Sequence, residues 1–299
     1  AGGDVSQVVL SLIAAEKAYR AGALTADQTL RLYLGIPFTQ EELNAPITVA
    51  EENWNPRTRA LILRSAASQK VPLARAEVLR RAWQIGRERE SYAQIAGPSV
   101  PLAAELTPAV ELNWFAGDAA RVLFAGGRIE EALAWYRIAA RDRDVADEAR
   151  AAEAALWPLA ILADTENSVP LSDERLTAWY DARRQADPQA GANQARTLFA
   201  LMAALGRPLS PAVWQSLLNT PFGGDDTGLN VAWQSRVDEA TAGRLLGEAV
   251  LLATIGAGES TDGFLKLGDA LRVISALRAV GLEQDARLLA IETAVASGL

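Results

Sequence analysis

The side chains available for chemistry in this sequence are carboxylates, hydroxyls, amines and guanidinium groups. Among its 299 residues are 37 Asp and Glu and 29 Lys and Arg, but no His and no Cys. The missing histidine removes the commonest general base, the usual partner of a nucleophilic serine and the commonest zinc ligand. The missing cysteine removes disulfides, thiolate metal sites and cysteine nucleophiles. Any catalysis would depend on carboxylates, Tyr, Lys or Arg alone.

One acidic residue stands in a context that suggests catalysis. Glu259, in Gly258-Glu259-Ser260, is similar to the Glu-Ser pair of soluble lytic transglycosylases, which are helical enzymes of the cell envelope. The resemblance implies a glutamic acid of raised pKa that cleaves glycan in a deep cleft. The surrounding motif of those enzymes is absent. A carboxylate-dependent, glycan-cleaving enzyme is therefore kept as an alternative function.

Two other groups of acidic residues resemble metal sites only in composition. Arg141-Asp142-Arg143-Asp144 has no matching acidic cluster elsewhere, so a solvated turn before a helix N-terminus explains it better. Asp225-Asp226 lacks the alternating oxygen ligands of a calcium loop. The sequence predicts neither a metal nor a cofactor.

Charge and hydropathy limit the partners and the location of the chain. A net charge of −8 repels a phosphate backbone, so we expect no nucleic acid partner. The longest apolar stretch, Leu245–Ile255, is shorter than the roughly 20 residues of a spanning helix, which predicts a buried helix and no membrane insertion. The cations are nearly all Arg, which favours a bacterial origin. The absent cysteine and absent initiator Met favour a periplasmic over a cytoplasmic location.

Apolar residues recur at helical spacing along most of the chain, for example over residues 5–19, 129–140 and 267–277. Helix starts are indicated by Ser or Thr before or at the opening of such runs, with Pro following two of them. Helix ends are indicated by Gly just after them, where a left-handed residue closes a helix. The proposed starts are Thr25, Thr58, Thr107, Ser172 and Ser210, and the proposed ends are Gly22, Gly127, Gly206 and Gly281.

Three segments interrupt this pattern. Residues 43–56 and 219–231 contain Pro, Asn, Gly and Asp without a helical stripe, and both are predicted to be loops. The second is either a surface connection or a functional lid. Residues 97–101, Gly-Pro-Ser-Val-Pro, suggest a subdomain break. Because helical stacks continue through such kinks, the sequence predicts one domain over residues 1–299.

Residues 113–144 have the helix–turn–helix pattern of one repeat unit. Small and apolar residues stand at matching positions on both predicted helices, with a glycine between them: Ala120, Leu123, Gly127, Ala132, Tyr136 and Ala139. This pattern resembles a tetratricopeptide repeat. Residues 271–296 form a looser copy, in which Thr293 replaces the usual small residue. The resemblance implies an all-α fold, a right-handed stack of antiparallel helical hairpins with irregular repeats.

The same resemblance implies a binding surface. In tetratricopeptide repeats the first helix of each hairpin lines a concave groove, and the matching positions are Trp114, Arg121 and Phe124. Arg pairs with carboxylates through two hydrogen bonds, and Trp is a frequent hot spot of interfaces. Packing against the next hairpin is the alternative for Trp114 and Phe124. Most of the eight Trp residues are interpreted as structural.

We therefore expect a non-enzymatic scaffold or adaptor that binds a protein or peptide in a concave helical groove. Besides the glycan-cleaving enzyme, a second alternative is a structural protein that forms a homo-oligomer through the apolar segment Leu245–Ile255.

Overall fold

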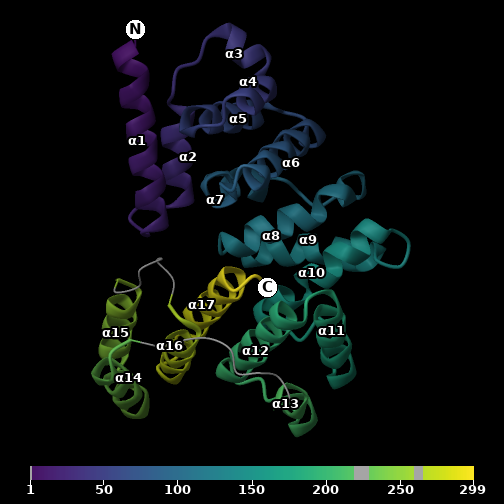
Figure 1. The fold of residues 1–299 in the computed structure, drawn as a ribbon, viewed down its shortest axis with the longest axis vertical. Helices are drawn as coiled ribbons and strands as arrows, with labels where there is room; N and C mark the ends of the chain where they lie inside the picture. The colour runs from purple at the N-terminus through teal and green to yellow at the C-terminus, as the bar shows by residue number, and fades with distance from the viewer. Residues whose placement is uncertain (1, 219–228, 259–264) are drawn as a thin grey trace. The chain divides into compact units, whose positions relative to one another are not determined.

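The computed structural model describes residues 2–218, 229–258 and 265–299, and every regular element in these residues is helical (Figure 1). They contain seventeen α-helices and one 3₁₀ helix, η1. The predicted all-α class is confirmed. The chain divides into two compact units, residues 1–153 and 154–299, rather than at residues 97–101.

Unit 1 consists of helices that pack mainly against their neighbours in the sequence, as in α6 with α7 and α8 with α9. Helix α2 also packs on α5 and α7, so the first hairpins are not stacked strictly in chain order. The elements are α1 (Gly2–Arg20), α2 (Ala26–Leu34), α3 (Gln40–Asn44), α4 (Pro46–Glu52), α5 (Pro56–Ser68), α6 (Pro72–Glu88), α7 (Tyr92–Ala104), η1 (Val110–Phe115), α8 (Ala116–Ala125), α9 (Ile129–Asp142) and the start of α10 (Asp147–Ala163).

Unit 2 begins within α10 and follows the same plan, with α11 paired to α12 and α16 paired to α17. Helix α16 also contacts α12, α14 and α15. The elements are α11 (Asp173–Ala186), α12 (Pro188–Ala204), α13 (Pro211–Leu218), α14 (Val231–Gly243), α15 (Leu246–Gly258), α16 (Leu267–Ala279) and α17 (Glu283–Ala296).

Most helix boundaries follow the predicted signals. Thr25 and Ser172 are N-caps whose side-chain oxygens accept from the third backbone N–H of α2 and α11. The four predicted C-terminal glycines all have positive φ, between 71° and 89°, which costs glycine nothing. Thr107 is the exception, because the chain after it forms the 3₁₀ helix η1 before α8 begins. The N-cap residues and the C-terminal glycines therefore determine where most hairpins turn.

Residues 97–101 do not break the fold, because they lie inside α7. Pro98 and Pro101 each remove an internal hydrogen bond, and an isolated helix would be kinked or ended there. Tertiary packing overrides this cost, since Ile95, Val100 and Ala103 are buried. Gly97 contributes as well, because a Cβ at this position would lie 2.2 Å from the Tyr19 ring. The Gly-Pro segment is a close contact between α7 and α1.

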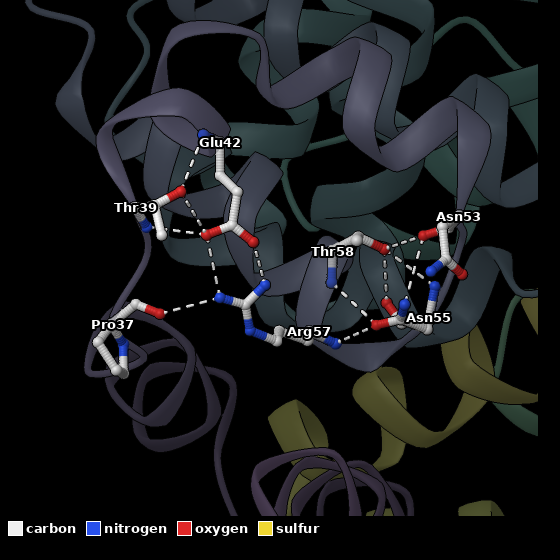
Figure 2. A network of polar contacts seen from close by, with 7 residues as sticks. All are labelled: Pro37, Thr39, Glu42, Asn53, Asn55, Arg57 and Thr58. Carbon is white, nitrogen blue, oxygen red and sulfur yellow. Dashed lines mark hydrogen bonds and ion pairs between the residues drawn. The ribbon is translucent and has the colours of Figure 1, made fainter. Parts of the chain in front are cut away.

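The predicted loop at residues 43–56 is mostly helical, which corrects the sequence reading. It contains α4, which starts at Pro46 with the fixed φ that suits a first helical position. The segment lies between two capping boxes, one formed by Thr39 and Glu42 and the other by Asn55 and Thr58. Arg57 connects the two capping boxes. It lies within the second box, directly after Pro56, and its guanidinium donates to both carboxylate oxygens of Glu42 in the first box (Figure 2). The same guanidinium also reaches the Pro37 carbonyl, at 3.2 Å.

Acid should weaken this network through Glu42. Its hydrogen bond with Arg57 is the main cause that lowers the pKa of Glu42 from 4.5 to about 2. Because the folded pKa lies below the unfolded one, this stabilisation is complete above the unfolded value and is lost as pH falls toward 2. We expect Arg57→Gln to cost about 1 kcal/mol at neutral pH. The melting-temperature gap to the wild type, followed by circular dichroism, should narrow between pH 4.5 and 2.

The matched control is Arg150→Gln. Arg150 forms an ion pair with Asp147, and both side chains are well exposed, so this change should have little effect at any pH. If the gap for Arg57→Gln keeps its full size down to pH 2, the pair does not contribute through the Glu42 charge.

An aromatic cluster is buried in the core of unit 1. Phe115 stacks on Trp83 with ring centroids 5.3 Å apart and meets Trp135 edge-on at 5.6 Å. All three side chains are fully buried. The Trp83 indole N–H donates to Ser99 Oγ at 2.8 Å, which gives its polar edge a partner inside the core. The cluster joins α6, η1 and α9.

A buried charged network joins the first helices of unit 1. Arg59 on α5 donates from Nε and Nη2 to Glu16 on α1, at 2.7–3.0 Å. The Tyr33 hydroxyl on α2 donates to the same carboxylate at 2.5 Å. Glu16 and Arg59 are each only 6% exposed. A buried ion pair of this kind needs its full set of hydrogen bonds to offset the cost of removing two charges from water.

The predicted burial of the apolar segment Leu245–Ile255 is wrong. This segment forms most of α15, where only Ala249 and Gly256 are buried. Gly256 lies against Trp233, since a Cβ there would come within 2.6 Å of the indole ring. The opposite face is open, with Val250, Leu251 and Ile255 between 41% and 59% exposed. None of the helices in the described residues has the length and hydropathy needed to cross a bilayer.

Candidate functional site

The three residues predicted to line a groove have different environments. Arg121 lies on α8 and is partly exposed, and Trp114 lies in η1, also partly exposed. Phe124 is 1% exposed and belongs to the core, so packing, the alternative weighed for it, describes this side chain. A ring sealed from solvent offers no surface to a partner. The candidate surface is therefore built around Trp114 and Arg121.

Trp114 is fixed from two sides. Its indole N–H donates to the Glu111 carbonyl oxygen at 2.9 Å. The guanidinium carbon of Arg80, on α6, lies 5.1 Å from the centroid of the indole ring. A guanidinium at this distance is attracted to the ring face. The Trp114 ring therefore carries on its face the charged side chain of Arg80, which lies more than thirty residues earlier in the sequence.

Asp118 is the acidic centre of this surface. Arg80 Nε lies 3.4 Å from one of its oxygens, and Arg87 Nη1 lies 3.1 Å from the other. Arg80 also donates to Glu148 on α10 through Nη2 at 2.6 Å. One carboxylate of α8 thus holds two arginines of α6 in place.

Arg87 lies over the ring of a tyrosine at the start of α7. The guanidinium carbon of Arg87 lies 5.4 Å from the centroid of the Tyr92 ring. Burial raises the pKa of Tyr92 to about 12, against the opposing positive charges of Arg87 and Arg121. We call this surface the arginine–aromatic strip, and define it by Arg80, Arg87, Tyr92, Trp114, Asp118 and Arg121.

Helical periodicity places the strip residues of each segment on one face of that segment. Arg80 and Arg87 are two turns apart on α6, and Trp114, Asp118 and Arg121 repeat at spacings of four and three. The backbone of α8 also approaches α10 closely, because a Cβ on Gly117 would lie 2.8 Å from the Ala152 Cβ. The sequence shows both periodic sets, but only the fold shows that α6 and α8 bring them together. Arg80, Arg87 and Tyr92 were not predicted for this reason.

The strip combines guanidinium groups, aromatic rings and carboxylates. Arg80 and Arg87 both contact Asp118, and each lies over an aromatic ring, with Glu148 beside Arg80. Guanidinium groups bind carboxylates and phosphates through paired hydrogen bonds, and neighbouring rings add apolar contact area.

The other sequence candidates do not add to this site. Glu259, Asp225 and Asp226 lie outside the described residues, as do residues 219–228 of the predicted loop. The described part of the chain contains no group of three or more acidic residues placed to hold a metal ion. Five of the eight Trp residues are buried, namely Trp83, Trp135, Trp157, Trp179 and Trp233, as a structural role requires.

Comparison with known proteins assigns no relative to the chain. No family model matches it, and neither the curated proteins nor the solved structures contain a significant match.

Proposed function

We propose that this protein is a non-enzymatic scaffold that binds a peptide or protein segment on the arginine–aromatic strip. The observation that supports the proposal is that Arg80 and Arg87 contact Asp118 and each lie over an aromatic ring, with Arg121 three residues after Asp118 on α8. Arg, Trp and Tyr are the residue types most often found as hot spots. The lack of His and Cys also favours binding over catalysis.

In this proposal the α8–α9 hairpin is a tetratricopeptide-like unit. Its positions Ala120, Leu123, Ala132 and Tyr136 are all buried, and Gly127 closes α8 with φ +71°. Small residues at such positions let two antiparallel helices approach closely. The remaining hairpins would then be divergent units of an irregular α-solenoid, a class whose exposed helix faces commonly bind extended peptides.

The test is selection of peptides from a random display library on the immobilised protein, followed by affinity measurements on the selected peptides. We expect Trp114→Ala and Arg121→Gln each to weaken binding about tenfold or more, as loss of a hot-spot contact does. The matched control is Arg128→Gln, because Arg128 is an exposed arginine that pairs with Glu131 outside the strip. Peptides that bind all four proteins equally, or failure to select any peptide, would refute the proposal.

A second function, self-association, is favoured by the exposed apolar face of α15. Glu248 is the charged residue within this helix, and it already pairs with Arg236 of α14. Two copies of the face opposite Ala249 and Gly256 could therefore meet without opposing like charges, as an isologous contact requires. Exposed apolar patches of this kind commonly mark interfaces. We propose a second copy of the chain as the occupant.

Sedimentation over a hundredfold range of concentration tests this proposal. The wild type should shift from monomer to dimer, and Leu251→Glu should remain monomeric across the range. The matched control is Leu10→Glu on α1, which changes another leucine that is 66% exposed and should dimerise as the wild type does. A wild type that stays monomeric, or a control that loses the dimer as well, would exclude α15 as the interface.

A further inference from the structure

Two arginines of unit 2 bind neighbouring carbonyls at the C-terminal end of α10. Arg207, in the segment after α12, donates through Nη1 to the Ile161 carbonyl at 2.5 Å and through Nη2 to the Asp164 carbonyl. Arg287, on α17, donates through Nη1 to the Leu162 carbonyl at 2.7 Å. The last turn of α10 therefore holds two guanidinium groups from two other elements close together.

A third arginine reaches this region from α16. Arg278 donates through Nη1 to the Ala204 carbonyl, at the end of α12, at 2.9 Å, and its Nε lies 3.3 Å from a Glu283 oxygen. Its guanidinium covers Gly206, because a Cβ at that position would lie 2.2 Å from Nη2. Since Gly206 directly precedes Arg207, the guanidinium of Arg278 lies beside the backbone that carries Arg207.

The bonds to carbonyls use only part of the donor capacity of these side chains. A guanidinium has five N–H groups and no acceptor atom. Nε and Nη2 of Arg287 have no hydrogen-bond partner among the described residues, and neither atom is sealed from solvent. The same holds for Nε of Arg207. Donors on both arginines can therefore be reached by a ligand.

No carboxylate is bonded to Arg207 or Arg287 in the part of the chain that the structure describes. Asp164, the acidic residue that follows α10, accepts instead from the Val169 N–H at 2.8 Å. Burial and, after it, the positive charge of Arg207 lower the pKa of Arg287, against the smaller opposing effects of Glu283 and Asp164. Two like charges are thus held near each other without a counter-charge bonded to both.

A phosphate group would supply the missing acceptor. It carries three or more acceptor oxygens and up to two negative charges. It can therefore accept from Arg207 and Arg287 through separate oxygens and still offer one to Arg278. A carboxylate has only two oxygens, and one guanidinium can bind both of them. Guanidinium groups from three different elements match a tetrahedral oxyanion better than a planar carboxylate.

We propose that Arg207 and Arg287, with Arg278 beside them, form a binding site for a phosphate group, either the free ion or a small monoester. The site lies within unit 2 and goes beyond the proposed function, whose strip lies within unit 1. The carbonyls of α10 hold two of the guanidinium groups before the ligand arrives, which lowers the cost of ordering them on binding.

Isothermal titration calorimetry of the full chain tests this site, with inorganic phosphate, glycerol phosphate and acetate as ligands at constant ionic strength. We expect both phosphates to bind about tenfold more tightly than acetate, or better. The tighter of the two shows whether the free ion or the monoester is the preferred form. Arg287→Gln should weaken phosphate binding about tenfold or more, since it removes charge-assisted hydrogen bonds.

A second variant and a control complete the test. Arg287→Lys keeps the charge but loses the paired donors, so its affinity should lie between those of Arg287→Gln and the wild type. It also replaces the Gln variant if circular dichroism shows that variant to be unfolded. The matched control is Arg272→Gln, because Arg272 lies on the same helix as Arg278 but forms an ion pair with Asp238 at 2.6 Å. This change should leave phosphate binding unchanged.

Three results would overturn the site. They are the absence of binding by either phosphate, acetate affinity equal to that of phosphate, and phosphate affinity that is the same in the folded Arg287 variants as in the wild type. A loss of phosphate binding in Arg272→Gln as large as in Arg287→Gln would also overturn it, because the effect would then follow from total charge. None of these results bears on peptide binding by the strip.

Discussion

Replacing Glu16 by leucine should lower the free energy of unfolding by about 3–5 kcal/mol, because it leaves a buried cation without its counter-charge. Arg59 is 6% exposed and places three hydrogen bonds on this one carboxylate. The Tyr33 hydroxyl loses its acceptor in the same variant. Urea unfolding, followed by circular dichroism, measures the loss directly from the shift of the midpoint at unchanged slope.

The double variant Glu16→Leu/Arg59→Met distinguishes the loss of the ion pair from the cost of leaving Arg59 buried without a counter-charge. Apolar replacement of both members of a buried ion pair is often neutral, whereas removal of one member is not. We expect the double variant to recover most of the stability lost in Glu16→Leu. The exposed pair of Arg150 with Asp147 provides the comparison, and Asp147→Asn should cost at most about 1 kcal/mol. A loss for Glu16→Leu no larger than that would show that Arg59 finds water or another partner.

Replacing Phe115 by alanine should cost about 3–5 kcal/mol, as deletion of a buried aromatic ring does elsewhere. Its ring stacks on Trp83 and meets Trp135 edge-on, and each of these residues is fully buried. The deletion removes apolar contact area and leaves a cavity whose walls are two rigid indole rings. Such walls relax little, which places the expected cost toward the upper end of the range.

Phe115→Leu should cost clearly less than the alanine variant, because it keeps most of the apolar volume. Phe38→Ala is the matched control, since Phe38 is a partly exposed phenylalanine whose ring contacts the guanidinium of Arg57. It should cost about 1 kcal/mol. Equal midpoints for Phe115→Ala and Phe38→Ala in urea would show that the cluster collapses around the missing ring.

Local signals in the sequence predict the helices well, because each signal acts within a few residues. The four glycines with positive φ terminate helices through a backbone conformation that other residues rarely adopt. The repeat positions Ala120, Leu123, Ala132 and Tyr136 are buried as their periodicity indicates. These features need no knowledge of distant residues.

The errors in the predicted fold arise where contacts between residues far apart in the sequence determine the structure. Pro98 and Pro101 remain inside α7 because its packing outweighs two lost hydrogen bonds. The close contact of Gly97 with Tyr19 joins residues far apart in the sequence. Helix α15 has the composition of a buried helix, yet most of its surface is exposed. The apolar composition of a helix alone does not show which other helix, if any, will cover its apolar face.

The candidate site was predictable in part for the same reason. Trp114 and Arg121 share one periodic face, which the sequence shows directly. Phe124 differs from Arg121 by three positions, yet its ring points into the core. The partner residues on α6 and α7 are brought to α8 by tertiary packing. Nothing in the sequence around Arg80 and Arg87 indicates that their side of α6 contacts α8.

The course of α10 restricts how the protein can be divided. The helix runs from Asp147 to Ala163, and the boundary between the two units falls inside it, after Glu153. Its first half contributes Glu153, which accepts from Tyr136 Oη at 2.9 Å, and its second half contributes Leu156 and Trp157 to the buried residues. A cut at the boundary would leave each fragment with a stub of helix too short to hold its shape in water. Recombinant halves should therefore overlap, as 1–163 and 147–299, so that each contains the whole helix.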